Sequence, residues 1–215
     1  MRRTVTAVLA LSTALALGAC GADSDDRSVS PRPGQADTED LTAGPSGAAD
    51  EGIQVTTATL KDASGADKGT VEVNDLDGKT EFVFEVTGLP AGFHGLHLHK
   101  IGKCEPNSAD PTDAAKKGDF LSSGGHLGEG DHPEHSGDLP PLLVQKDGSA
   151  TMRVTTDRVN PDEILDQDGT AIVVHGEPDN FANIPKRYSS SGPDAETKKA
   201  GDAGPRVACG AFTPQ

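Results

Sequence analysis

Alternation of apolar and polar residues is the most regular pattern in this 215-residue chain, and it begins near residue 52. Three segments rich in β-branched residues carry it, 53–60, 70–76 and 80–86, and turn clusters of glycine and aspartate separate them. Five more segments complete a set of eight candidate strands: 95–99, 139–144, 150–156, 170–176 and 206–212. A period of two is typical of half-buried strands. It predicts an all-β fold, an eight-stranded antiparallel Greek-key β-sandwich or flattened barrel with two long loops, at 100–138 and 177–204.

Local signals add a turn and a helix to this fold. Asp77 and Gly78 join two of the strand segments and predict a tight hairpin turn. "NPDEIL" at 160–165 supplies an asparagine cap and a proline in the first turn, and it predicts the one helix. Because aromatic residues make up only 3% of the chain, we expect a core of Val, Leu, Ile and Ala.

The chain before residue 52 has a different character. Residues 1–19 combine a basic start, an apolar run shorter than a membrane span and small residues before Cys20. This segment resembles a bacterial lipoprotein signal peptide, in which Cys20 is lipidated, and the alternative is an ordinary secretory signal. Residues 20–51 are acidic and poor in large apolar residues, which predicts a disordered tether to a domain at 52–215. We therefore expect an exported protein, lipid-anchored to the outer face of the cell membrane.

Net charge, aromatic content and cysteine content indicate which partners and which cross-link to expect. The formal net charge of -15 argues against nucleic-acid binding, which needs a basic face. The low aromatic content favours a monomer. If Cys20 carries lipid, the other two cysteines, Cys104 and Cys209, form a disulfide bond in an oxidising compartment.

Candidate chemistry begins with the strand "GLHLH" at 95–99. Side chains alternate along a strand, so His97 and His99 share one face while the intervening leucines point to the core. Two imidazoles on one face of a rigid strand predict a metal chelate. His94 has the opposite parity, so we expect it to be buried and hydrogen-bonded to backbone.

Four further histidines lie downstream. His175 ends an apolar strand, where burial without a partner would be costly, and is a third or fourth candidate ligand. His126, His132 and His135 lie in the loop "GGHLGEGDHPEHSGD" among several acids. That loop is either a solvated acidic connector or, as its three histidines favour, part of a metal site.

Five segments, "GLHLHKIGKC", "GGH", "HSGDL", "VVHGEPDN" and "GDAGPRVACG", resemble in order the signature segments of the Cu/Zn superoxide dismutases, over about residues 53–213. The resemblance implies dismutation of superoxide to dioxygen and hydrogen peroxide, with four copper ligands: His97, His99, His126 and His175. It also implies that Cys104 and Cys209 form the disulfide of the family.

The resemblance gives roles to further residues. Arg206 corresponds to the active-site arginine that attracts superoxide, and His126 to the histidine that bridges the two metals and carries a proton. Asp179 corresponds to the aspartate that orients ligands of both metals, or it holds His126 if zinc is absent. In a chain of net charge -15, Arg206, helped by Lys186 and Arg187, has to create a local positive funnel.

Zinc is the second implied cofactor, with four ligands: His126, His132, His135 and Asp138. Five residues separate His126 from His132 and two separate His132 from His135, a closer spacing than in the family. The short loop is similar to that of copper-only bacterial members, so a site without zinc is the alternative.

Two other functions fit parts of the pattern. One is a non-catalytic surface protein that binds or buffers copper, which Arg206 argues against because a cation near the metal does not help storage. The other is a structural β-sandwich whose histidine-rich loop scavenges zinc, which leaves His97, His99 and His175 unexplained.

Overall fold

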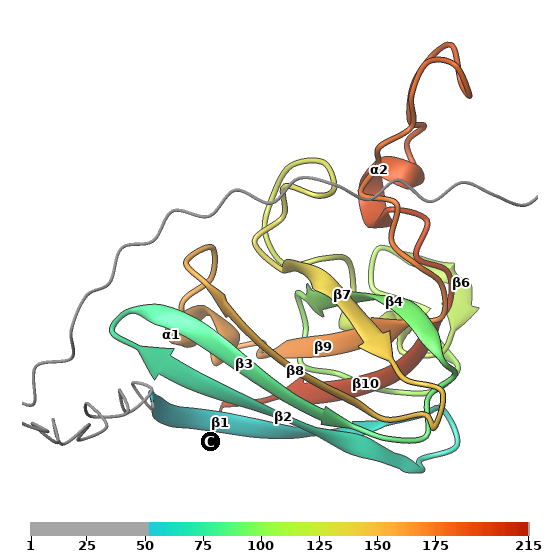
Figure 1. Cartoon of the computed structure of the whole chain (residues 1–215). Coiled ribbons are helices and arrows are strands. Elements are labelled where there is room, and N and C mark those ends of the chain that lie inside the picture. The colour runs from blue at the N-terminus through green and yellow to red at the C-terminus, as the bar shows by residue number, and fades with distance from the viewer. Residues whose placement is uncertain (1–51, 215) are drawn as a thin grey trace, which may run out of the picture. The chain divides into compact units, whose positions relative to one another are not determined.

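The computed structural model describes residues 52–214 (Figure 1). The predicted signal peptide, the predicted lipidation site Cys20 and the predicted tether at 20–51 lie outside the described residues. Within 52–214, no helix is long and apolar enough to span a membrane.

The described chain contains ten strands: β1 (Ile53–Lys61), β2 (Asp67–Leu76), β3 (Lys79–Val86), β4 (Gly92–His99), β5 (Ser108–Asp110), β6 (Asp113–Gly118), β7 (Asp138–Val144), β8 (Ala150–Thr156), β9 (Thr170–His175) and β10 (Arg206–Phe212). Two short helices, α1 (Pro161–Ile164) and α2 (Thr197–Ala200), and a 3-10 turn, η1 (Leu121–Ser123), lie in the connections.

Eight of the strands form one antiparallel sheet in the order β7-β4-β9-β10-β1-β2-β3-β8. The end strands β7 and β8 contact each other, so the sheet curves into a nearly closed barrel (Figure 1). The non-sequential neighbours are the Greek-key crossovers, and the predicted eight-stranded antiparallel barrel is confirmed. The β5-β6 hairpin was not predicted, because β6 is polar and exposed and shows no alternation.

Both local predictions hold. Asp77 and Gly78 have positive φ angles of 52° and 83°, as a tight turn between β2 and β3 requires. Asn160 caps α1 by accepting a hydrogen bond from the Glu163 backbone N–H, and Glu163 caps Asn160 in return. Helix α2 was not predicted, because it has only four residues and no side chain caps its N-terminus.

The core lies inside the barrel, between β1, β2, β3 and β8 on one side and β4, β7, β9 and β10 on the other. Leucines of β1, β4 and β7 and valines of β2 pack there. The expectation of a core without aromatic residues is wrong, since four phenylalanines are fully buried: Phe82, Phe84, Phe120 and Phe212. Each contributes on the order of 1.5–3 kcal/mol through burial, so few aromatic residues suffice.

Strand β4 lies between β7 and β9 and sets the position of the histidines. Its register places His97 opposite Asp138 of β7 and Val173 of β9. Strand β10 pairs with β9 so that Arg206 is opposite His175. The loop before β7 and the loop that carries α2 rise on the same side of the barrel (Figure 1), and they are joined by a 2.6 Å hydrogen bond from the His132 N–H to the Lys198 carbonyl.

Candidate metal centre

Four buried histidines from three parts of the fold meet beside β4. We call them the four-histidine cluster: His97 and His99 on β4, His126 in the loop before β7, and His175 at the end of β9. None is more than 6% exposed, and one ring nitrogen of each lies within 4.8 Å of the others. An isolated backbone bridge between His99 and His126 draws the loop against β4.

Each histidine of the cluster uses one ring nitrogen for a protein partner. The hydrogen bonds are His97 Nε2 to Asp179 Oδ2 (2.8 Å), His99 Nδ1 to Gly124 O (2.8 Å), His126 Nδ1 to Asp138 Oδ1 (2.7 Å) and His175 Nδ1 to Gly204 O (3.1 Å). The other nitrogen of each ring is buried and has no hydrogen-bond partner: Nδ1 of His97 and Nε2 of the other three. Such atoms are costly to bury, so their convergence fits a metal ion.

The protonation of the cluster suits metal binding. Burial lowers the pKa of His99 and of His175 well below the ordinary value, and the charge of Arg206 adds to the effect. Burial also lowers the pKa of His126 to about 4, although Asp138 opposes the shift. These rings are therefore neutral at pH 7, and neutral imidazole offers the lone pair that a metal needs. Four imidazole nitrogens are a donor set that suits copper.

A second group forms around Asp138, at the start of β7. Asp138 Oδ1 lies 2.7 Å from His126 Nδ1, and Asp138 Oδ2 lies 3.0 Å from Nδ1 of both His132 and His135. Three imidazoles and one carboxylate are an acceptable tetrahedral set for zinc. One ligand atom from each of His126, His132 and Asp138 lies within 4.8 Å of the others and of a ring nitrogen of His97. His135 is not part of this set. The short loop thus brings the three histidines of the predicted zinc set against the Asp138 carboxylate, with His135 outside the group whose ligand atoms all lie within 4.8 Å of one another.

Asp179, four residues after β9, links the two groups. Its carboxylate accepts hydrogen bonds from His97 Nε2 and His132 Nε2, both at 2.8 Å. The alternative that Asp179 holds His126 is wrong, because His126 bonds to Asp138. Burial opposes a charge on His132, but Asp138 and Asp179 outweigh it and raise its pKa to about 9. The two carboxylates therefore stabilise a positive charge at this position.

Arg206 lies beside the four-histidine cluster and is firmly held. Its guanidinium donates to Phe120 O (2.6 Å), Ser123 Oγ (2.9 Å) and Gly124 O (2.7 Å). The Gly124 carbonyl also accepts from His99, so one oxygen connects Arg206 to the cluster. Burial lowers the pKa of Arg206 to about 10, with Asp110 opposing, and the group remains a cation at neutral pH.

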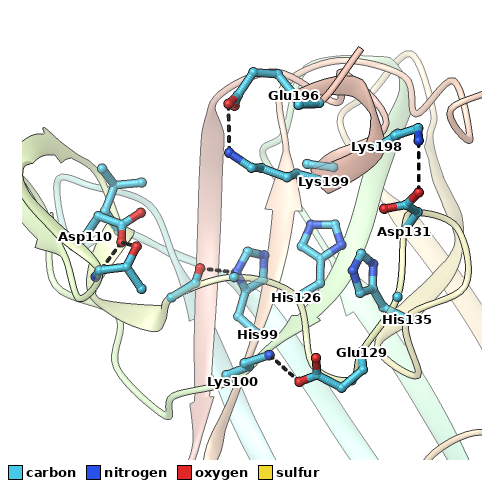
Figure 2. Close-up of a pocket in the computed structure, with 18 of the residues that line it drawn as sticks. His99, Lys100, Asp110, His126, Glu129, Asp131, His135, Glu196, Lys198 and Lys199 are labelled. Atoms are coloured by element: carbon cyan, nitrogen blue, oxygen red, sulfur yellow. Dashed lines mark hydrogen bonds and ion pairs between the residues drawn. The ribbon is translucent and has the colours of Figure 1, made fainter. Parts of the chain in front are cut away.

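A pocket of about 750 Å³ opens from these residues to the surface (Figure 2). Four lysines line it: Lys100, Lys116, Lys198 and Lys199. Three of them form ion pairs with acids of the rim, namely Lys100–Glu129 (3.1 Å), Lys198–Asp131 (3.2 Å) and Lys199–Glu196 (2.8 Å). Lys186 and Arg187, which we expected to assist Arg206, do not line the pocket, and Arg187 stacks on Tyr188.

Three other predicted residues have structural roles. His94 is 2% exposed, and its ring nitrogens lie 2.7 Å from the His175 carbonyl and 2.8 Å from the Pro90 carbonyl, so it braces backbone as expected. Cys104 and Cys209 form the predicted disulfide bond across a separation of 105 residues. The bond ties the loop after β4 to β10, three residues from Arg206.

Sequence reasoning missed several functional groups. The carbonyl oxygens of Gly124 and Gly204, which orient His99 and His175, have no signature in side-chain identity. Three of the pocket lysines, Lys116, Lys198 and Lys199, were visible only as members of "KK" pairs at 116–117 and 198–199, which are ordinary in exposed loops, and Lys100 stands alone after His99.

Fold and site together define a metalloprotein: an antiparallel barrel with a four-imidazole site next to a histidine-carboxylate site. Residues 67–212 match the copper/zinc superoxide dismutase (SODC) family. The superoxide dismutase (Cu-Zn) of Mycolicibacterium paratuberculosis is 40% identical over 223 residues, covering 98% of this chain and 98% of that protein. That of Mycobacterium bovis is 46% identical over 169 residues, 74% of this chain and 70% of that protein.

Solved structures agree with this assignment. The Cu/Zn superoxide dismutase from Brucella abortus has a TM-score of 0.57 at 28% identity, covering 73% of this chain and 97% of that chain. The chain belongs to the copper/zinc superoxide dismutase family. The family predicted from the sequence segments is confirmed, and with it the assignment as an oxidoreductase that acts on superoxide.

Proposed function

We propose that this enzyme dismutates superoxide at a copper ion held by His97 Nδ1 and by Nε2 of His99, His126 and His175. The observation that carries the proposal is the convergence of these four buried nitrogens, each without a hydrogen-bond partner. Their protein-bound nitrogens fix the ring orientations, which is the arrangement expected of metal-ligating histidines.

Copper bound there supplies alternate one-electron oxidation and reduction, so that two superoxide anions and two protons yield dioxygen and hydrogen peroxide. The chain contributes anion binding and protons. Arg206, a half-buried cation that lines the pocket, attracts and orients the anion. His126, which lines the same pocket, is the residue proposed to hold a proton at Nε2 whenever that atom is not bound to copper, and to pass it to the product.

We also propose zinc at His126, His132, His135 and Asp138. Support comes from the three Nδ1 atoms that lie within 3.0 Å of the Asp138 carboxylate. Asp138 belongs to β7, and His126 is bridged to β4, so two of the four groups rest on the barrel itself. The role of zinc would be to hold this loop and to orient His126.

The cellular location is a further part of the proposal. A lipid on Cys20 would anchor the enzyme to the outer face of the cell membrane, and residues 20–51 would tether the domain. The basic, apolar and small-residue order of residues 1–19 supports this. Replacing Cys20 with serine should release the protein into the medium; retention on the membrane would contradict lipid anchoring.

One experiment tests the metal proposals together. The purified protein should contain one copper and one zinc per chain and dismutate superoxide rapidly, as measured by metal analysis and pulse radiolysis. Full activity with copper alone would overturn the zinc assignment and support the copper-only alternative. Bound copper without dismutation would favour the rival function, a surface copper buffer.

A further inference from the structure

Gly201, directly after α2, lies very close to Asp179, the residue that links the four-histidine cluster to the group around Asp138. A Cβ atom built on Gly201 would overlap Asp179 Oδ1 and lie 2.7 Å from His132 Nε2. These are the two atoms of the hydrogen bond by which Asp179 holds His132. The absence of a side chain at residue 201 is therefore what leaves space for that hydrogen bond.

Hydrogen bonds on both sides hold the backbone at Gly201 in place. Its carbonyl accepts the Asn180 N–H at 2.8 Å, and its own N–H donates to the Thr197 carbonyl at 2.9 Å. Asp202 accepts a further hydrogen bond from the Asn180 side chain at 2.6 Å. A side chain at residue 201 would consequently displace the Asp179 carboxylate, and with it the His132 ring that the carboxylate holds, rather than the backbone.

We propose that Gly201 is a positioning residue for the second metal: it lets Asp179 lie against the chain and bridge His97 and His132, which orients His132 toward zinc. The inference rests on the proposed zinc site. In this proposal Gly201 does more than end α2, because it also supports metal binding through Asp179.

A simpler role must be separated from this one. Gly201 has a φ angle of 57° at the C-terminal cap of α2, a conformation that favours glycine in any protein. Gly192, in the same loop, has a similar φ of 76° and no atom within 4 Å of a built Cβ. Gly192→Ala therefore carries the same conformational penalty without the contact, and it serves as the matched control.

The experiment measures Zn(II) affinity of the copper-loaded protein by chelator competition, together with the visible spectrum of Co(II) bound in place of zinc. Gly201→Ala should weaken Zn(II) binding roughly 10- to 100-fold, as expected when a ligand-orienting contact is lost, and change the Co(II) spectrum. Gly192→Ala should stay within about twofold of the unaltered protein.

A double-mutant cycle tests the route through Asp179. If Gly201 acts on that carboxylate, Gly201→Ala should weaken Zn(II) binding by less than about twofold once Asp179→Ala is present. An equal loss in both backgrounds, or unchanged affinity of Gly201→Ala alone, would overturn the inference. If the unaltered protein binds no Zn(II), the proposed zinc site is wrong, and the inference about Gly201 is then wrong as well.

Discussion

His97 and His99, two residues apart on one strand, leave different ring nitrogens free: Nδ1 of His97 and Nε2 of His99. The difference follows from their partners, since the Asp179 carboxylate engages His97 Nε2 and the Gly124 carbonyl engages His99 Nδ1. Both remaining lone pairs belong to the four-histidine cluster. The shared face of β4 thus places the two rings together, and the hydrogen-bond partner of each ring determines which nitrogen is left for a metal.

Loss of a cluster histidine should remove copper. We expect His99→Gln to weaken copper binding by more than about 100-fold, beyond the effect of losing an orienting partner. The matched control is His94→Gln on the same strand, which loses backbone contacts but no free nitrogen. It should lower the melting temperature and keep copper bound. Copper dissociation constants by chelator competition would check this, and equal losses in the two variants would contradict the ligand assignment.

Arg206 should govern turnover rather than metal binding. Arg206→Gln removes the half-buried cation near His175, and we expect the dismutation rate to fall at least about tenfold with copper content unchanged. Arg187→Gln removes the same charge from the loop without touching the pocket, so its rate should match the unaltered enzyme. Rates by pulse radiolysis and copper by metal analysis decide the case. Unchanged turnover in Arg206→Gln would favour copper buffering.

Ionic strength should reduce activity. The attraction to superoxide is local, because the whole chain carries -15 and three of the rim lysines are paired with acids. Raising salt from about 0.01 to 1 M shortens the screening length from about 30 to 3 Å, so the pull of Arg206 on distant anions is lost. We expect a fall of about twofold or more in the rate constant. A flat or rising dependence would refute attraction by a positive pocket.

Glu81 of β3 should make stability depend on acid pH. It is 4% exposed; burial alone would raise its pKa, but hydrogen bonds from Arg153 and Asn74 outweigh burial and lower the pKa below 4.5. The ionised form therefore stabilises the fold at neutral pH, and this contribution is lost as pH falls through the lowered pKa of the folded state.

Glu81→Gln should accordingly lower the free energy of unfolding at pH 7 by about 1 kcal/mol, a modest value because Arg153 is largely exposed. The difference from the unaltered protein should narrow as pH falls below 4.5. Glu85→Gln makes the same charge change at an exposed position of β3 and serves as the control. Urea unfolding across pH measures both, and a difference that does not vary with pH would contradict the assignment.

The disulfide bond should stabilise the domain strongly. Replacing Cys104 and Cys209 with serine removes a cross-link across 105 residues, worth about 4 to 5 kcal/mol in the chain-entropy account. The rate should fall too, because the bond holds the segment that carries Arg206. Cys20→Ser, outside the domain, should leave the urea midpoint unchanged. Equal midpoints with and without the Cys104–Cys209 bond would refute the stabilisation.

Strand content was predictable because strands such as β8 alternate between less and more exposed residues, while β9 is a short apolar run that is buried along its whole length. The segments 150–156 and 206–212 match β8 and β10 residue for residue. The β5-β6 hairpin and α2 were missed because they are short and exposed, and their residues carry no periodic signal. Both form walls of the pocket, so the part of the chain hardest to predict is the part that shapes access to the site.

The sequence by itself determined the family, the antiparallel barrel, the cysteine pair and the pairing of His97 with His99 on one strand face, since each depends on residue type and local spacing. Only the tertiary structure decided the path of the short histidine loop. Spacing alone left His132 and His135 in question, but the bridge to β4, the Asp138 carboxylate and the Lys198 carbonyl draw them together. The tertiary structure also decided which nitrogen of each ring is free and how close Gly201 comes to Asp179. These are contacts between segments far apart in the chain, which local spacing cannot specify.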